Sequence, residues 1–114
     1  MNKPGIVTAI PRRRYKYGEF TVVILGEIES SDAICYRYIM AVMKGSDPSP
    51  GVYLTAEQSG PTDPNYNMRM IMQDGAEIIG TSTAWDDLDA FAGDALGIIG
   101  QVLDLSDEVP YRLM

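Results

Sequence analysis

The chain of 114 residues contains no histidine and a single cysteine, Cys35. Without histidine, the commonest general base near neutral pH is missing, and so are the Ser-His and Cys-His pairs that activate a nucleophile. The usual zinc ligand sets are missing too, and one cysteine forms no internal disulfide. Neither a glycine-rich phosphate loop nor a pair of carboxylates with a plausible cleft is visible. These absences predict a protein that is not an enzyme and that binds no metal and no cofactor.

Long apolar runs are also lacking. No stretch approaches the roughly 18 to 20 apolar residues of a membrane-spanning helix. Met1–Gly5 lacks the basic start and the apolar stretch of a secretory signal. We therefore expect a soluble, cytoplasmic protein without membrane contact. Its length fits one domain over residues 1–114, with residues 104–114 as either a flexible tail or a docking tail.

Positive charge is scarce, since nine Lys and Arg stand against sixteen Asp and Glu, which gives a net charge of −7. Five of the nine cations lie within the first sixteen residues, namely Lys3, Arg12, Arg13, Arg14 and Lys16. The acidic residues gather in the C-terminal third. We expect a bipolar field, which disfavours generic binding to polyanions.

Several segments have the composition of β-strands. Phe20–Leu25 is nearly all apolar and rich in β-branched residues, which is typical of a strand buried on both faces, and we expect it at the centre of the sheet. Ile6–Ile10 predicts a short strand that Pro11 interrupts, and Arg12–Tyr17 alternates like an exposed edge strand. Further strands are predicted at Ile34–Met43 and Val52–Thr55.

The clearest local signal is Asp74-Gly75, which predicts a two-residue hairpin turn between Asn67–Gln73 and Ala76–Thr81. The first arm places one set of side chains on a single face, which we expect to point into the core: Tyr66, Met68, Met70 and Met72. Cys35, inside another predicted strand, is expected to be a small buried side chain.

A helix is predicted over residues 84–103. Thr83 is expected to be its N-cap, with Asp86 favourably placed near the positive helix end. An apolar stripe recurs at spacings of three and four: Trp85, Leu88, Ala92, Ala95, Ile99 and Val102. Because no helix separates the strands, the fold class is α+β. We expect an antiparallel meander of five to six strands, open or half-barrel, with one C-terminal helix packed on one face.

Small residues mark the helix side opposite this stripe: Ala90, Gly93, Gly97 and Gly100. Each glycine costs about 0.8 to 1 kcal/mol relative to alanine inside a helix. Two interpretations stay open. Either the sheet contact holds the helix despite the glycines, or a partner backbone approaches this face closely, so that the protein self-associates as a homodimer or binds another protein.

A basic and aromatic strand offers a different function. Its cations could hold phosphates while its rings stack on bases. The residues concerned are Arg12, Arg13, Arg14, Tyr15, Lys16 and Tyr17, and Arg37 could extend the surface. The alternative is an edge strand that charge protects from aggregation, with its tyrosines packed inward. Asp86, Asp87 and Asp89 are explained by the helix N-terminus rather than by a metal.

The sequence therefore favours a small interaction module that binds a protein partner or itself. A binder of single-stranded nucleic acid through Arg12–Tyr17 is the alternative, and an enzyme comes third.

Overall fold

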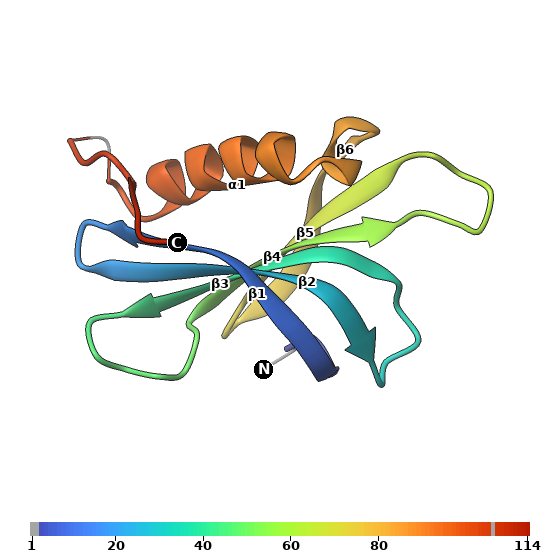
Figure 1. Cartoon of the computed structure of the whole chain (residues 1–114), viewed down its shortest axis with the longest axis horizontal. Helices are drawn as coiled ribbons and strands as arrows, with labels where there is room; N and C mark the ends of the chain where they lie inside the picture. Colours follow the sequence, from blue (N-terminus) through green and yellow to red (C-terminus); the bar gives the residue numbers. More distant parts are fainter. Residues whose placement is uncertain (1–2, 106) are drawn as a thin grey trace.

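The computed structural model describes residues 3–105 and 107–114. Within these residues, seven strands form one antiparallel sheet, and a single α-helix lies along one of its faces (Figure 1). The elements in chain order are β1 (Ile6–Tyr17), β2 (Phe20–Ser30), β3 (Tyr36–Lys44), β4 (Val52–Gln58), β5 (Tyr66–Met72), β6 (Gly75–Ser82), the 3₁₀ turn η1 (Ala84–Asp86), α1 (Leu88–Val102) and β7 (Tyr111–Arg112). The predicted α+β class and the C-terminal helix are confirmed. The sheet has seven strands rather than five to six, and it is not closed.

The spatial order of the strands is β6-β5-β4-β3-β2-β1-β7. The strand predicted to be central, β2, is therefore third from one end, and β3 takes the middle position. Two strands are buried on both faces: β4, where Val52 through Glu57 are all buried, and β3, where Tyr38 through Val42 are. The seventh strand comes from the C-terminal tail, whose Tyr111 and Arg112 pair with Lys16 and Tyr15 of β1.

The interruption predicted at Pro11 is wrong, since β1 is continuous from Ile6 to Tyr17. Proline lacks a donor but is tolerated at a sheet edge or a bulge. Both conditions hold here. The outer side of β1 is paired by β7 only at Tyr15 and Lys16, and the register with β2 shifts between Pro11 and Arg13.

The prediction that Cys35 is buried is also wrong, because its side chain is exposed. The residue precedes β3, and the register between β3 and β4 shifts between Tyr36 and Tyr38. That irregularity moves Tyr36 to the face away from the helix, where it packs with Ile39, while Tyr38 packs on the helix side. The predicted alternation of side chains between the two faces over Ile34–Met43 therefore fails at the start of that segment.

The hairpin of β5 and β6 forms as expected, with its turn one residue earlier. Met72 pairs with Gly75, so the two turn residues are Gln73 and Asp74. The methionine face of β5 does point toward the helix. Met68 is fully buried there, and Met70 and Met72 pack against the same core.

The helix begins later than predicted. Thr83 makes no side-chain cap, and the chain first forms η1, which buries Trp85. The N-cap of α1 is Asp87, whose carboxylate accepts a hydrogen bond from the N–H of Ala90 at 3.0 Å. At the other end Asp104 takes a positive φ of 55°, and the N–H of Leu105 donates to the carbonyl of Gly100 at 2.8 Å. This is a Schellman ending, with Leu105 buried against the core.

Two apolar clusters stabilise the molecule. The larger lies between the helix and the sheet and includes Phe91, whose ring stacks on Tyr38 with centroids 5.5 Å apart. The smaller lies on the opposite face of the sheet around Ile39, Tyr53 and Ile71. Among the described residues, no helix has the length and apolar character needed to cross a membrane.

Candidate functional site

The outer face of α1 is narrower than its sequence suggests. Gly93 and Gly97 are exposed, and a Cβ built on either would meet no atom within 4 Å. Ala90 is half-buried. Gly100 does not belong to this face, because it is buried and a Cβ there would collide with the hydroxyl of Tyr17. The absence of a side chain at Gly100 thus serves packing within the chain.

The rings of the basic strand are not accessible. Tyr15 and Tyr17 are both buried in the core under the helix. Arg14, which precedes Tyr15, and Lys16, which lies between the two tyrosines, are exposed. The cations and the rings predicted to act together on a nucleic acid therefore do not share an open surface.

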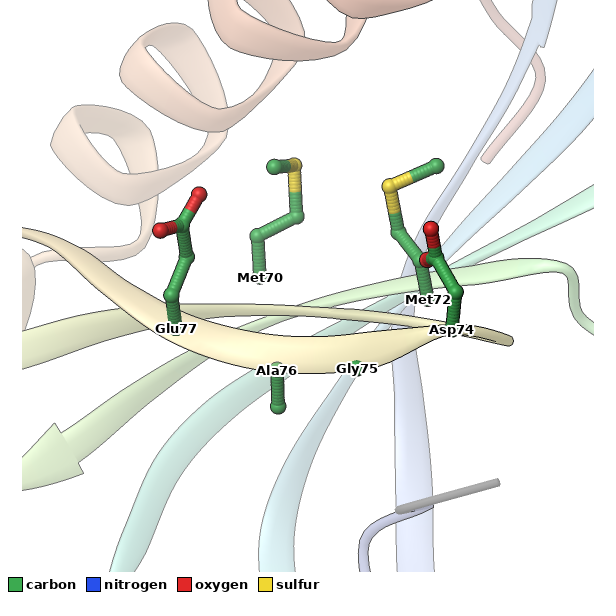
Figure 2. A pocket seen from close by; sticks show the side chains of 6 residues that line it. All are labelled: Met70, Met72, Asp74, Gly75, Ala76 and Glu77. Atoms are coloured by element: carbon green, nitrogen blue, oxygen red, sulfur yellow. The ribbon is translucent and has the colours of Figure 1, made fainter.

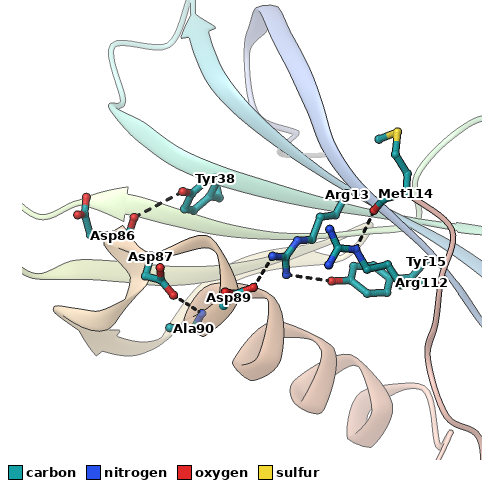
Figure 3. Close-up of polar contacts among 9 residues, drawn as sticks. All are labelled: Arg13, Tyr15, Tyr38, Asp86, Asp87, Asp89, Ala90, Arg112 and Met114. Carbon is teal, nitrogen blue, oxygen red and sulfur yellow. Dashed lines mark hydrogen bonds and ion pairs between the residues drawn. The ribbon is translucent and has the colours of Figure 1, made fainter.

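Arg13 points to the helix side and forms an ion pair with Asp89 of the first turn of α1 (Figure 3). The Arg13 guanidinium lowers the pKa of the Asp89 carboxyl, and the Asp89 and Tyr15 hydrogen bonds raise the pKa of Arg13. The Arg13 Nε is buried and has no hydrogen-bond partner within residues 3–105 and 107–114. This arginine fixes the helix to β1.

Arg37 makes a second link to the same end of the helix. Its Nε donates to the carbonyl of Asp86 at 3.1 Å and lies 3.3 Å from the Asp86 carboxylate. The guanidinium also sits 4.9 Å from the centre of the Tyr38 ring, and Tyr66 donates to the Asp86 carboxylate at 3.0 Å. Two of the cations predicted for nucleic acid are therefore engaged in holding η1 and α1.

A polar cleft occupies the sheet face opposite the helix. Glu57 is buried there and accepts hydrogen bonds from Thr55 at 2.8 Å and from Arg69 at 2.9 Å. Two cavities of about 440 and 700 Å³ meet at Arg69 and Ile34. Because the charges of Glu57 and Arg69 cancel, this pair gives the cleft no preference for a cationic or an anionic ligand. Sequence reasoning missed the pair, because only the fold brings these two strands together.

A smaller hollow of about 340 Å³ lies on the helix side of the β5–β6 hairpin, lined by Met70, Met72, Asp74, Gly75, Ala76 and Glu77. Figure 2 shows the side chains of Met70, Met72, Asp74 and Glu77 on the helix side of the strands, and Ala76 on the other side. The hollow has a methionine floor and carboxylates at its rim.

This hollow borders a free sheet edge. Within the described residues, no strand pairs with the outer side of β6. Pairing in an antiparallel ladder uses the N–H and C=O of alternate residues, so about every second residue of β6 turns these groups outward. Ile78 is 50 % exposed on this strand. The register shift opposite Met68 and Arg69 leaves Ile79 as an extra residue, so the regular part of the edge is residues 75–78.

The two sheet edges differ in how they are protected. Charge, proline, bulges and a covering strand are the usual protections of an edge. β1 has all four, with Pro11, three consecutive arginines, three register shifts and β7. The sequence of β6, Gly-Ala-Glu-Ile-Ile-Gly-Thr-Ser, contains no proline and no cation, and Glu77 is its one charged residue.

No group of three or more potential metal-ligating His, Cys, Asp or Glu side chains occurs among the described residues. Comparison with known proteins finds no matching family model, no matching curated protein and no matching solved structure. The geometry of the surface is therefore the basis for a functional proposal.

Proposed function

We propose that this protein is a non-enzymatic interaction module that binds another polypeptide by strand addition at the edge of β6. The observation that carries the proposal is the asymmetry between the two sheet edges. Within the part of the chain that the structure describes, the β6 edge has no cation, no proline and no covering strand, and its only protections are Glu77 and the bulge at Ile79. Over residues 75–78 it presents a row of unpaired backbone donors and acceptors, which is the template used in β-strand addition.

The exposed side chains support the same site. Ile78 is half-exposed on the face of β6 away from the helix, and the hollow at residues 70–77 lies on the helix side of the same strand. In strand addition, backbone hydrogen bonds give affinity while pockets for alternate side chains give specificity. Both components are present at β6.

A second copy of the chain is the other occupant that the sequence suggests. Self-association through Gly93 and Gly97, or through two β6 strands, stays a proposal. Light scattering on a size-exclusion column measures it directly. A stable dimer that dissociates in Ile78→Lys would assign β6 as the dimer edge.

Nothing in the geometry favours the nucleic-acid alternative, because the two rings of its strand are buried. It stays a prediction that anisotropy titration with single-stranded oligonucleotides at low salt can test. The cytoplasmic location likewise stays a prediction from the sequence.

The experiment for strand addition uses a panel of short synthetic peptides. Each alternates valine with one second residue, either lysine, norleucine or glutamate. Amide hydrogen exchange, followed residue by residue by NMR, reports which backbone groups become protected on binding. We expect at least one peptide to protect the amides of residues 75–78.

A matched pair of variants distinguishes binding at the β6 edge from nonspecific binding to exposed apolar residues. Ile78 and Ile10 are 50 % and 49 % exposed and lie on β6 and on the part of β1 that β7 does not pair. Ile78→Lys should abolish the protection, whereas Ile10→Lys should leave it unchanged. The proposal is wrong if no peptide protects β6, or if both variants bind as the natural sequence does.

A further inference from the structure

We propose that the strand added to β6 carries a lysine or arginine on its helix-side face, with the side-chain stem over Met70 and Met72 and the charge between Asp74 and Glu77. This inference rests on the proposed function, since it names the chemistry of the partner segment. Four features of the hairpin lead to it.

The first feature is a gap in the row of side chains nearest the free edge. Pairing places Glu77 beside Met70 and Gly75 beside Met72 on the same face. Gly75 has no side chain, and a Cβ built there would meet no atom within 4 Å. A long side chain from an added strand can therefore cross over Gly75 and reach Met72.

The second feature is charge. Asp74 and Glu77 flank the gap, and no ion pair or hydrogen bond involves either carboxylate among the described residues (Figure 2). The lining of the hollow contains no cation. An acidic side chain would meet repulsion from both sides, whereas a cation would be complementary to both.

The third feature is the floor. Met70 and Met72 are half-buried, and methionine adapts its shape to neighbouring groups. Lysine and arginine bury an aliphatic stem on apolar surface while the charged end stays in water. A short cation would leave this floor uncovered, and a neutral apolar residue would leave the carboxylates unpaired.

The fourth feature sets the residues on either side of the cation. Successive side chains of a strand alternate between faces, so its neighbours would lie on the side of Ala76 and Ile78. The β6 side chains on that side, Ala76 and Ile78, are both apolar, and Arg69 of β5 lies one strand further in. The predicted partner segment alternates apolar residues with at least one lysine or arginine. A second β6 strand does not fit this description, because β6 contains no cation.

The peptide panel tests the inference by titration at low salt. We expect the lysine peptide to bind more tightly than the norleucine peptide, and the glutamate peptide to bind most weakly. Glu77→Gln and Asp74→Asn should each weaken lysine-peptide binding about two- to fivefold, as for exposed ion pairs. Neither variant should change binding of the norleucine peptide. Added salt should reduce the lysine advantage.

Glu27→Gln is the control, because Glu27 is an exposed carboxylate on β2, away from the β6 edge. It should leave lysine-peptide binding unchanged. If norleucine and lysine peptides protect β6 with equal affinity, the cation inference is wrong while strand addition stands. If no peptide protects β6, strand addition itself is wrong. A lysine preference that survives in the Glu77→Gln, Asp74→Asn double variant would place the cation elsewhere and overturn the assignment.

Discussion

At the scale of single residues, the three helix glycines have different environments although their spacing suggests one surface. Gly93 and Gly97 face open space, whereas Gly100 lies against the buried ring of Tyr17. The helix can approach β1 closely at that point because Gly100 has no side chain. One position is thus required by packing and two are not.

Substitution by alanine should separate these roles. Gly93→Ala and Gly97→Ala should each stabilise the protein by about 1 kcal/mol, the difference in helix propensity. Gly100→Ala should destabilise it by about 1 to 3 kcal/mol, because the new methyl group overpacks the contact with Tyr17. Urea unfolding followed by the fluorescence of Trp85, the single tryptophan, measures all three.

Tyr17→Phe provides the control for this prediction. Removing the hydroxyl leaves room for the methyl group, so Gly100→Ala should cost less in the Tyr17→Phe background. Equal costs in both backgrounds would show that the collision does not determine the loss of stability.

Residue environments were the least predictable part from sequence. The inward packing of Tyr15 and Tyr17 agrees with the edge-strand interpretation. The exposure of Cys35, by contrast, depends on a register shift at the start of β3, and the burial of Gly100 depends on where the helix crosses the sheet. Neither is encoded in local spacing. The free edge of β6 was missed for a similar reason, because a strand is known to be an edge only when the spatial order of all strands is known.

At the scale of elements, the start of α1 shows how tertiary contacts override a local capping signal. Thr83 has the right residue type, but burial of Trp85 and the contacts of Asp86 with Arg37 and Tyr66 hold the next residues in a 3₁₀ turn. Asp87 then takes an extended backbone, with φ −93° and ψ 131°, and caps the helix.

Asp87→Ala should therefore destabilise the protein by about 1 kcal/mol, the typical cost of losing an N-cap. Thr83→Ala should change stability little, since Thr83 makes no side-chain cap. Thermal or urea unfolding of the two variants gives the comparison. If Thr83→Ala destabilised the protein more than Asp87→Ala, Thr83 rather than Asp87 would be the N-cap.

Elements with strong periodicity were predicted well. The β5–β6 hairpin, its methionine face and the C-terminal helix followed from spacing and turn residues alone. Boundaries shifted where two residue types competed for one role, as at Gln73–Asp74 against Asp74-Gly75, or where a bulge relieved a local rule, as at Pro11.

At the scale of the whole molecule, the face opposite the helix has its own small core, and the N-terminal segment is attached beside it. The Asp32 carboxylate accepts hydrogen bonds from the N–H of Gly5 at 2.9 Å, the hydroxyl of Tyr36 at 2.7 Å and the N–H of Ile34 at 3.2 Å. Partial burial opposes ionisation, but these hydrogen bonds outweigh it and lower the pKa of Asp32 below its ordinary 3.8.

This attachment predicts a contribution to stability that depends on pH. Because the folded pKa of Asp32 is depressed, its contribution is complete above the unfolded value and is lost as the pH falls through the folded value. The stability difference between the natural sequence and Asp32→Asn should be largest near neutral pH and should shrink below about pH 4. Urea unfolding at several pH values measures it. A difference that stays constant down to acidic pH would contradict the role assigned to this carboxylate.

The unequal protection of the two sheet edges also limits the size of any assembly. Sheets polymerise when both ends accept strands, because each added molecule presents a new growing end. Here the β1 end is protected against addition by its arginines, by Pro11, by its bulges and by β7 at Tyr15 and Lys16. A bound peptide would complete the sheet in a one-to-one complex, and two copies joined through β6 would present only protected β1 edges. A free strand edge at only one end of the sheet therefore allows specific association without fibril growth.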